Sequence, residues 1–285
     1  MTTQSQGPRP SIFITGAASG IGRATAKLFA NRGWFIGATD VSAAGLDTLR
    51  QESGADNIWT SALDVTDKNQ LETTLGAFVS AAGGRLDVMF NNAGIGESGW
   101  FEDVPYGAAL RVVQTNFIGV LNGAYAALPF LKTTPKSLMI STSSSSATYG
   151  MPRIAVYAAT KFAVKGLTEA LSAEWMRHGV RVADVLPGLI DTAILRSTPN
   201  RSGDAAARND AELYANAPKS GPFRLIPPEQ VAETVWAAYH GDQIHWYVPK
   251  EIGRIDQLKA FAPKMVRSRI MKAMPQLQKS DPPKS

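Results

Sequence analysis

The chain has 285 residues and a mass of 30.5 kDa, which suits one large domain or two small ones at roughly 100–200 residues per domain. Its 44% hydrophobic and 19% charged residues exclude a disordered chain and a fibrous repeat. The chain has no cysteine, so disulfides, thiolate nucleophiles and cysteine-ligated metal centres are excluded. The three histidines, His178, His240 and His245, form no metal-binding spacing. We therefore predict no catalytic metal.

The net charge of +5 is concentrated at the C-terminus. Residues 250–285 hold nine basic and three acidic residues, a net charge of +6, so the remaining 249 residues sum to −1. A protein that binds nucleic acid usually carries its basic face on the folded body. Because the body of this chain is close to neutral, we expect no nucleic-acid partner.

The N-terminal residues 1–10 are polar and contain prolines, without the apolar stretch of a secretory signal. We expect them to form a disordered tail. The longest charge-free run, over 112–131, contains Gln114, Asn116, Asn122 and Pro129, which favours a buried helix over a membrane span. These observations predict a cytoplasmic protein.

Apolar, β-branched runs alternate with helical patterns along most of the chain. Seven strands are predicted, over 11–15, 34–40, 57–63, 86–91, 137–143, 180–186 and 244–249. Helices are predicted near 20–32, 42–53, 67–82, 105–132, 154–178 and 228–240. Several of the strands are apolar throughout, as in strands covered on both faces. The alternation predicts an α/β fold, a doubly wound parallel seven-stranded sheet with helices on both faces, in one domain over 11–250.

Two segments do not fit this alternation. Residues 189–227 form a long connection rich in Ala, Asn, Asp, Arg and Pro, which we interpret as a lid over the substrate. Residues 251–285 form a basic C-terminal extension with helical spacing of apolar residues, broken at Pro263, and a solvated tail. The extension could lie on an anionic membrane, but packing on its own domain or a neighbouring subunit is the interpretation we favour.

A glycine-rich turn follows the first predicted strand directly and leads into a helix. Its spacing, Gly16-x-x-x-Gly20-x-Gly22, differs from the commoner G-x-G-x-x-G, and alone it could simply connect two elements. Glycines let the backbone approach a pyrophosphate closely, and the N–H groups at a helix start bind the anion. Its position after the first strand of an alternating chain predicts a nucleotide site.

Asp40 ends the second predicted strand, 24 positions after Gly16. A carboxylate there can accept hydrogen bonds from both hydroxyls of an adenosine ribose and would repel the extra phosphate of NADP. The turn itself contains no Lys or Arg that would offset this repulsion. The alternative is that Asp40 caps the next turn. Asp64, after the third strand, could contact adenine or could equally be a cap.

Tyr157 and Lys161 lie four residues apart at the start of a predicted helix, so their side chains share a face. A free tyrosine has a pKa near about 10, and a nearby ammonium lowers it. Such a pair suits acid–base catalysis on an alcohol or ketone. Alone, the Tyr-x-x-x-Lys spacing is uninformative, because most instances are a half-buried Tyr beside a solvated Lys.

Together these motifs resemble those of the short-chain dehydrogenase/reductase family, over about residues 11–250. The matching motifs occur in the family's order: Thr15-Gly16-x-x-x-Gly20-Ile21-Gly22, Asn91-Asn92-Ala93-Gly94, Asn116, Tyr157-x-x-x-Lys161 and Pro187-Gly188-x-x-x-Thr192. The resemblance implies a compact single-domain dehydrogenase with a Rossmann-like fold.

The resemblance also implies catalytic roles. Tyr157 would donate a proton to a ketone or accept one from an alcohol, Lys161 would bind the nicotinamide ribose and lower the tyrosine pKa, and Asn116 would hold a relay water. The family's serine lies 13 positions before the tyrosine, which selects Ser144 over its neighbour Ser143. Ser144 would stabilise charge developing on the substrate oxygen.

For the cofactor, NAD is expected and NADP is less favoured. Asn92 and Gly94 should approach it, and Ile190 and Thr192 should fix the nicotinamide carboxamide. The residues expected to contact the cofactor are Gly16, Ser19, Gly20, Ile21, Gly22, Asp40, Asp64, Val65, Asn92, Ala93, Gly94, Tyr157, Lys161, Pro187, Gly188, Ile190 and Thr192.

The expected function is thus an NAD-dependent oxidoreductase for a secondary alcohol or ketone. Tyr149, Met151, Ile95 and the lid are expected to wall the pocket, which favours an apolar substrate. The alternatives are an NADP-dependent carbonyl or 3-oxoacyl reductase and a non-catalytic NAD-sensing scaffold. By resemblance, a homodimer or homotetramer built on the helices over 105–132 and 154–178 is expected.

Overall fold

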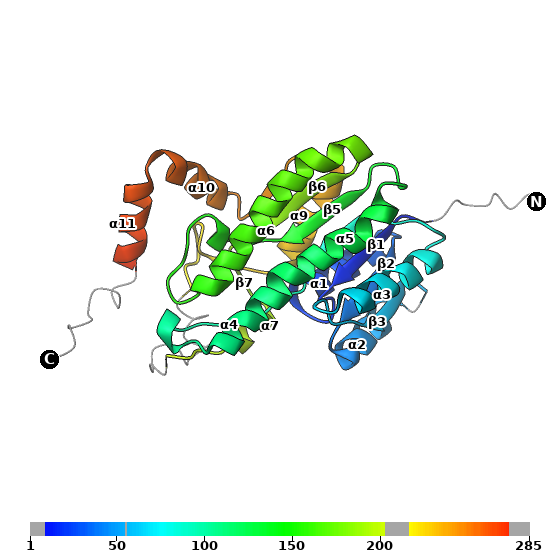
Figure 1. Cartoon of the computed structure of the whole chain (residues 1–285), viewed down its shortest axis with the longest axis horizontal. Coiled ribbons are helices and arrows are strands. Elements are labelled where there is room, and N and C mark those ends of the chain that lie inside the picture. The colour runs from blue at the N-terminus through cyan, green and yellow to red at the C-terminus, as the bar shows by residue number, and fades with distance from the viewer. Residues whose placement is uncertain (1–8, 55, 203–216, 274–285) are drawn as a thin grey trace, which may run out of the picture.

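The computed structural model describes residues 9–54, 56–202 and 217–273 of the chain. A seven-stranded sheet forms its centre, in the order β3-β2-β1-β4-β5-β6-β9 with every pair parallel (Figure 1). Its strands are β1 (Ser11–Thr15), β2 (Phe35–Asp40), β3 (Ile58–Ala62), β4 (Val88–Asn91), β5 (Leu138–Thr142), β6 (Arg181–Pro187) and β9 (His245–Val248). The predicted doubly wound parallel sheet of seven strands is confirmed.

Helices lie between the strands, and two more, α10 and α11, follow the last strand. They are α1 (Gly20–Asn31), α2 (Ala43–Ser53), α3 (Lys68–Ala81), α4 (Tyr106–Val113), α5 (Gly119–Leu131), α6 (Ala155–Glu174), α7 (Ala193–Ser197), α9 (Pro228–His240), α10 (Glu251–Phe261) and α11 (Pro263–Ala273). Short 3₁₀ turns occur at η1 (Phe101–Asp103), η3 (Ser145–Ala147) and η4 (Trp175–His178). Local capping fixes some helix starts, since Asp67 accepts a hydrogen bond from Gln70 N at 2.9 Å before α3.

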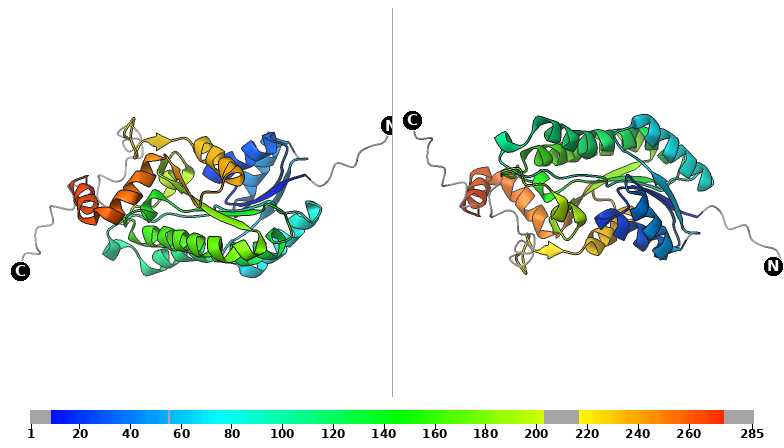
Figure 2. Two further views of the ribbon diagram at one scale, coloured as in Figure 1. Left: turned by 90° about the horizontal axis from the view of Figure 1, so that it is seen from above. Right: turned by 90° about the horizontal axis from the view of Figure 1, so that it is seen from below.

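The two faces of the sheet carry separate apolar cores because successive side chains of a strand point to opposite faces. Ile12 and Ile14 pack with α1, α2 and α9, whereas Phe13 between them packs with α3 and α5. Figure 2 shows the sheet between these two helical layers, blue and gold on one side and cyan and green on the other. This arrangement explains why the strands are apolar throughout.

The helix expected over 105–132 forms in three pieces. A π-helical turn, η2 (Gln114–Ile118), separates α4 from α5, and Asn116 lies fully buried at its centre. Such π turns are rare insertions in helices and occur frequently at functional sites. The charge-free run therefore forms helices with one buried side, while Tyr125 on α5 is exposed. Within the described residues, no helix is both long enough and apolar enough to cross a membrane.

The segments outside the alternation are only partly described. The lid region contains a two-stranded parallel sheet of β7 (Leu189–Ile190) and β8 (Leu225–Ile226), and residues 203–216 of the lid lie outside the described residues. Most of the expected N-terminal tail also lies outside them. The expectation is wrong for its last two residues, since Arg9 Nη1 donates to Asn57 Oδ1 at 2.9 Å and Pro10 O accepts from Phe35 N at 2.9 Å.

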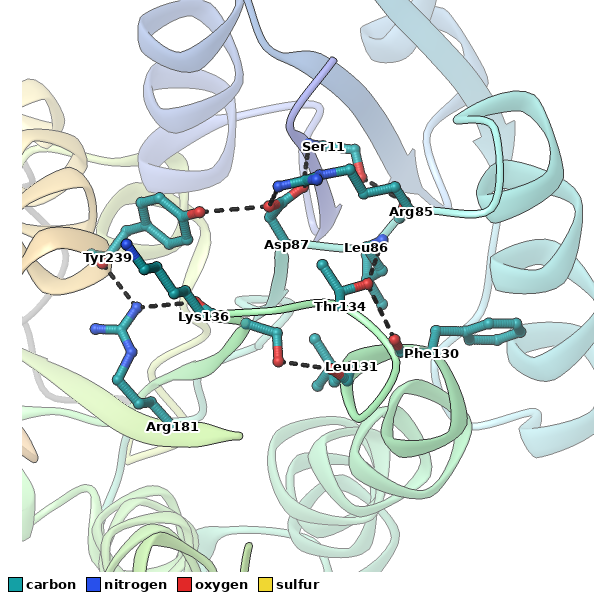
Figure 3. Close-up of polar contacts among 11 residues, drawn as sticks. Ser11, Arg85, Leu86, Asp87, Phe130, Leu131, Thr134, Lys136, Arg181 and Tyr239 are labelled. Atoms are coloured by element: carbon teal, nitrogen blue, oxygen red, sulfur yellow. Dashed lines mark hydrogen bonds and ion pairs between the residues drawn. The ribbon is translucent and has the colours of Figure 1, made fainter. Parts of the chain in front are cut away.

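At the amino end of the strands, a polar network surrounds the fully buried Asp87 (Figure 3). Its carboxylate accepts hydrogen bonds from Arg85 Nε at 2.7 Å, Ser11 N at 2.9 Å and the Tyr239 hydroxyl at 3.3 Å. Arg181 Nη2 donates to Tyr239 O at 2.7 Å and to Lys136 O at 3.2 Å. The network ties α9 and the segments before β1, β4 and β5 together at this end.

Candidate active site

The glycine turn lies at the carboxyl ends of β1 and β4, where the strand order reverses. In doubly wound sheets the ligand crevice forms at such a switch point. Gly16 has a φ of +70°, and a Cβ there would lie 2.8 Å from Ala93 Cα, so only glycine fits. Asn92 Nδ2 donates to Thr15 O at 3.0 Å and to Gly16 O at 3.1 Å. The segment after β4 therefore holds the turn in place.

A cavity of about 280 Å³ opens beside this turn. Most of the residues predicted from the sequence line it: Gly16, Ser19, Gly20, Ile21, Asp40, Asn92, Ala93, Gly94, Ser144, Tyr157, Lys161, Pro187, Gly188, Ile190 and Thr192. The structure thus brings together residues from six separate parts of the sequence. Gly22, Asp64, Val65 and Asn116 are not part of the lining.

The turn and its surroundings fit a dinucleotide. The helix α1 begins at Gly20 with its first backbone N–H groups at the cavity, the arrangement that binds a phosphate. A Cβ at Gly22 would lie only 2.2 Å from Gly16 O, so any side chain at this position would clash with the backbone of the turn. Thr192, from the lid, lies directly against the turn, since a Cβ at Gly20 would meet its Cγ2 at 3.1 Å.

Asp40 caps the neighbouring backbone and also faces the cavity. Its Oδ1 accepts from Ser42 N at 2.9 Å and its Oδ2 from Ala18 N at 3.1 Å. The capping alternative raised by the sequence is therefore present, and it orients the carboxylate at the cavity wall. Each oxygen keeps a lone pair that could accept a further hydrogen bond.

Asp64 and Val65 are placed differently. The carboxylate of Asp64 is exposed and accepts hydrogen bonds from Thr66 N at 2.9 Å and from Thr66 Oγ1 at 2.8 Å. Val65 is buried, and its carbonyl accepts from Asn122 Nδ2 at 2.9 Å. For Asp64 the structure displays the cap that the sequence left open, and an adenine contact remains a prediction.

Tyr157 and Lys161 lie in the first two turns of α6, and their spacing places both at the cavity. The Lys161 ammonium is 5.5 Å from the centre of the Tyr157 ring. Its Nζ donates to Thr142 O at 2.7 Å. Among the described residues no carboxylate pairs with it, and burial lowers the pKa of Lys161 to about 8.

The Tyr157 hydroxyl is buried and contacts Ser144. Burial raises the pKa of Tyr157 above its ordinary value, and a hydrogen bond with Ser144 opposes this rise. The lowering of this pKa by Lys161 stays a prediction, since the Lys161 amine donates to the Thr142 carbonyl and lies 5.5 Å from the centre of the tyrosine ring. At neutral pH the phenol is therefore protonated, as a proton donor must be.

The structure distinguishes Ser143 from Ser144, although both line the cavity. The Ser143 hydroxyl donates to Lys161 O at 3.0 Å, which binds it to the backbone of α6. The Ser144 hydroxyl accepts from Ser146 N at 3.1 Å and hydrogen-bonds with Tyr157. Ser144 is therefore the serine whose hydroxyl contacts the tyrosine.

Asn116 is fully buried and lies outside the cavity lining. Its Oδ1 accepts from Ile95 N at 2.8 Å, and its Nδ2 donates to Ile95 O at 2.9 Å. The amide thus fixes the backbone that follows β4. Gly94 makes this possible, because a Cβ there would lie 3.3 Å from Asn116 Oδ1 and 3.7 Å from Lys161 Nζ.

The apolar wall of the cavity comes from the segment expected to be the lid, 189–227. It is formed by Leu189, Ile190, Ile194 and Leu195, so the expectation that this segment walls the pocket matches the cavity lining. Tyr149, Met151 and Ile95 are not among the lining residues, so the expectation is wrong for these three in the described cavity. Sequence reasoning did not single out Thr142, the last residue of β5, and it named the lid without selecting individual apolar residues within it.

Known proteins share this arrangement. The sequence model of the family described as short chain dehydrogenase matches residues 10–202. The chain is 33% identical over 225 residues to a 3-oxoacyl-[acyl-carrier-protein] reductase of Thermotoga maritima, covering 78% of this chain and 87% of the relative. It is 37% identical over 235 residues to a 2-keto-3-deoxy-L-fuconate dehydrogenase of Xanthomonas campestris, covering 82% and 74%.

Solved structures agree with the sequence relatives. The 3-ketoacyl-(acyl-carrier-protein) reductase from Brucella melitensis, complexed with NADH, superposes with a TM-score of 0.73 at 26% identity, covering 84% of this chain and 96% of that chain. The glycine turn, the Tyr157–Lys161 pair and the sheet order are thus found together in a chain that these relatives match over most of its length. The chain belongs to the short-chain dehydrogenase family of oxidoreductases.

Proposed function

We propose that the protein is an NAD-dependent oxidoreductase that interconverts a secondary alcohol and a ketone. The observation that supports this proposal is that Ser144, Tyr157 and Lys161 line the same cavity as the glycine turn and Asp40. A nicotinamide bound there supplies or accepts the hydride. The chain itself supplies geometry, hydrogen bonds and the proton.

Each residue has a separate task in this mechanism. The Ser144 hydroxyl donates a hydrogen bond to the substrate oxygen as charge develops on it. The Tyr157 hydroxyl gives its proton to that oxygen in reduction and takes it back in oxidation. The Lys161 ammonium binds the nicotinamide ribose and holds positive charge near the phenolate that forms. We expect Asn116 to hold a relay water through its backbone carbonyl, since its side-chain amide is committed to Ile95.

Replacing Tyr157 tests the reaction. We expect Tyr157→Phe to lower kcat/KM by roughly 10²–10⁴-fold, because no other hydroxyl can transfer the proton, while cofactor affinity stays within a few-fold. The matched control is Tyr149→Phe, which removes a hydroxyl outside the cavity lining. The measurement is nicotinamide absorbance over a panel of secondary alcohols and ketones. A wild-type chain that binds NAD but turns over no substrate would instead favour the non-catalytic scaffold.

Asp40 supports NAD over NADP, because a carboxylate at the cavity wall repels a ribose phosphate. Arg23 lies near the same turn, donating to Ala18 O at 3.3 Å, but its Nη2 pairs with Glu52 at 2.8 Å. Its charge is therefore largely balanced. A carbonyl or 3-oxoacyl reductase that uses NADP is the alternative, and cofactor preference distinguishes the two.

The preference is measured as the ratio of kcat/KM with NAD to kcat/KM with NADP. We expect the wild-type ratio to exceed one and Asp40→Ala to lower it by roughly 10–100-fold, because the repulsion of the phosphate disappears. Asp64→Ala is the control, since this carboxylate follows the neighbouring strand β3 but lies outside the cavity lining. Equal effects of the two substitutions would refute the role of Asp40.

The substrate class follows from the cavity wall. Leu189, Ile190, Ile194 and Leu195 give the lid side of the cavity an apolar surface, which supports a substrate with an apolar group beside its carbonyl. We expect catalytic efficiency to rise along a series of ketones of increasing apolar size. Leu195→Ser should flatten that series without changing the affinity for NAD.

Self-association is the remaining part of the proposal. Tyr106 and Tyr125, on α4 and α5, are 77% and 66% exposed, and Leu110 is 41% exposed. Exposed apolar side chains on neighbouring helices support a homodimer or homotetramer built on this face. Light scattering of the wild type and of Tyr125→Glu gives the mass of each in solution. A monomeric wild type would refute the proposed self-association.

A further inference from the structure

The helices α10 and α11 follow β9 at the carboxyl end of the sheet. In Figure 1 and Figure 2, α11 lies at one end of the molecule, outside both helical layers. The first helix is firmly attached: Ile252 is buried, Lys165 Nζ contacts Asp256 Oδ2 at 2.5 Å, and Arg224 pairs with Glu251 at 2.9 Å. The Lys259 amine also lies 4.7 Å from the centre of the Phe162 ring, in α6. The domain therefore holds α10 in one orientation.

The outer surface of this helix pair carries exposed apolar side chains. Phe261, the last residue of α10, is 90% exposed at the corner between the helices. Met265 and Met271 on α11 are 40% and 37% exposed, whereas Val266 is buried and faces inward. Apolar side chains are thus presented outward at the corner and along α11.

Positive charge surrounds these apolar side chains without compensation. The helix α11 has no acidic residue, and its four bases are Lys264, Arg267, Arg269 and Lys272, all exposed. None of the four makes an ion pair with another residue in the described part of the chain. The two acidic residues of α10, Glu251 and Asp256, are already paired with bases of the domain. Within the described ranges 9–54, 56–202 and 217–273, the positive field of this outer face is therefore not neutralised by an acidic side chain, and it would attract an anion.

We propose that the α10–α11 corner binds the surface of an anionic lipid membrane. Phe261 and the two methionines would enter the boundary between headgroups and acyl chains, and the four bases of α11 would lie on the lipid phosphates. An exposed aromatic side chain at the end of α10, together with the methionines and bases of α11, is the combination that binds such a membrane surface. A helix pair without apolar exposure would suit an acidic soluble partner instead.

A second copy of this chain fits the corner less well. Two α11 helices facing each other would bring eight basic residues together without an acidic residue from either helix. The expected packing of the extension on its own domain holds for α10, as the Lys165–Asp256 pair shows, but it leaves the outer face of α11 open. The membrane contact uses that outer face and needs no change in the domain.

Vesicle co-sedimentation of the full chain tests the proposal. We expect binding to vesicles containing phosphatidylglycerol and phosphatidylcholine, little binding to phosphatidylcholine alone, and loss of binding as salt is raised. The triple variant Arg267→Gln, Arg269→Gln, Lys272→Gln should lower the vesicle affinity by roughly 100-fold, because each base contributes roughly a factor of five. Phe261→Ser should weaken binding several-fold with the charge unchanged.

Phe101→Ser is the matched control, since Phe101 is 72% exposed on η1, away from the helix pair, and its loss should leave vesicle binding unchanged. Thermal unfolding and activity on a water-soluble substrate should be unchanged in all these variants. The proposal is overturned if anionic vesicles do not bind, or if the triple variant binds them as the wild type does. It is likewise overturned if the same substitutions abolish binding of an acidic carrier protein or change the oligomeric mass while vesicles remain unbound.

Discussion

Buried charged groups have different hydrogen-bond partners at the two ends of the sheet. At the amino end, Asp87 is fully buried, and its carboxylate receives hydrogen bonds from Arg85, Ser11 and Tyr239 (Figure 3). At the carboxyl end, Lys161 is 3% exposed, and its amine donates to the carbonyl of Thr142, with no carboxylate partner among the described residues. Buried charge is normally paired or strongly hydrogen-bonded, because desolvating it is costly.

Most of the unpaired polar atoms lie at the carboxyl end. Among the described residues, the buried side-chain atoms without a hydrogen-bond partner belong to Asn91, Ser141 and Ser146 toward the carboxyl end, to Asp184 within β6, and to Ser53 at the end of α2. Polar groups are therefore used for stability at one end and kept available for chemistry at the other. Enzymes commonly give up stability at the active site for function. Substitutions at the two ends should consequently have opposite signatures.

Removing the buried amine should produce the largest effect. We expect Lys161→Met to lower kcat/KM by roughly 10²–10⁴-fold, because the ribose contact and the charge beside Tyr157 are lost. The same change should leave the free energy of unfolding equal or raise it by about 1–3 kcal/mol at neutral pH, because a buried, unpaired charge is removed. Activity assays and urea unfolding without added nicotinamide measure both quantities.

This stabilisation should depend on pH. Burial lowers the pKa of Lys161 to about 8 in the folded chain, so the unfolded chain binds more protons between there and the ordinary lysine value near about 10.5. The wild type therefore gains stability as pH rises through this window, and the advantage of Lys161→Met should shrink. Lys165→Met, one turn further along α6, should instead destabilise the fold, because it removes the cation paired with Asp256 and leaves that carboxylate with the Tyr247 hydroxyl. A Lys161→Met variant that is less stable than the wild type would contradict this difference between the two ends of the sheet.

Removing the buried carboxylate at the other end should have the opposite signature. We expect Asp87→Ala to lower the free energy of unfolding by about 3 kcal/mol, because Arg85, the Ser11 amide and the Tyr239 hydroxyl lose their acceptor. The kcat/KM of the folded enzyme should change less than about twofold, since the site is at the other end of the strands. Asp47→Ala, at an exposed position of α2, is the stability control.

Removing one hydrogen bond of the same network should have a smaller effect. We expect Tyr239→Phe to cost about 1 kcal/mol, because its hydroxyl donates to Asp87 Oδ1 over a long 3.3 Å. In the Asp87→Ala background the substitution should cost much less, since the acceptor is already gone. Tyr125→Phe provides an exposed control. Additive costs in the double variant would show that the two residues stabilise the fold independently.

The smallest effect concerns a buried carboxylate between the two ends. Asp184 in β6 is fully buried and hydrogen-bonds His245 Nδ1 at 2.7 Å, while His245 Nε2 lies 3.2 Å from Glu169 Oε1. Burial lowers the pKa of His245, but the hydrogen bond and charge of Asp184 outweigh burial and raise it overall, with Glu169 adding to the rise and Lys165 opposing it.

A histidine with a raised pKa stabilises the fold below its unfolded pKa and loses that contribution as pH rises through the folded value. The midpoint of urea unfolding should therefore fall as pH increases from about 6.5, the ordinary histidine value, through the raised pKa of folded His245. In His245→Asn this slope should disappear, because an amide keeps the hydrogen bond to Asp184 but does not titrate. An unchanged slope would assign the pH dependence to other groups.

The sequence determined the elements that depend on local pattern. Apolar runs and helical spacing predicted all seven strands of the sheet, because burial on both faces makes such strands apolar throughout. The glycine turn could be predicted from the sequence because Gly16 lies against Ala93 and Gly22 against Gly16 O, where no side chain fits. The Tyr157–Lys161 pair was also legible, since a spacing of four residues in a helix fixes a common face before any tertiary contact forms.

Only the tertiary structure decided which groups are engaged and which are free. Ser143 and Ser144 are neighbours in the sequence, but one bonds the backbone of α6 and the other meets Tyr157. The apolar wall at Leu189 and Leu195, and the contact between Asp87 and Tyr239 across 152 residues, arise from long-range packing. The same holds for Lys161, whose lowered pKa follows from burial. Local pattern fixes where a side chain points along its own element, whereas burial and pairing depend on what distant segments bring beside it.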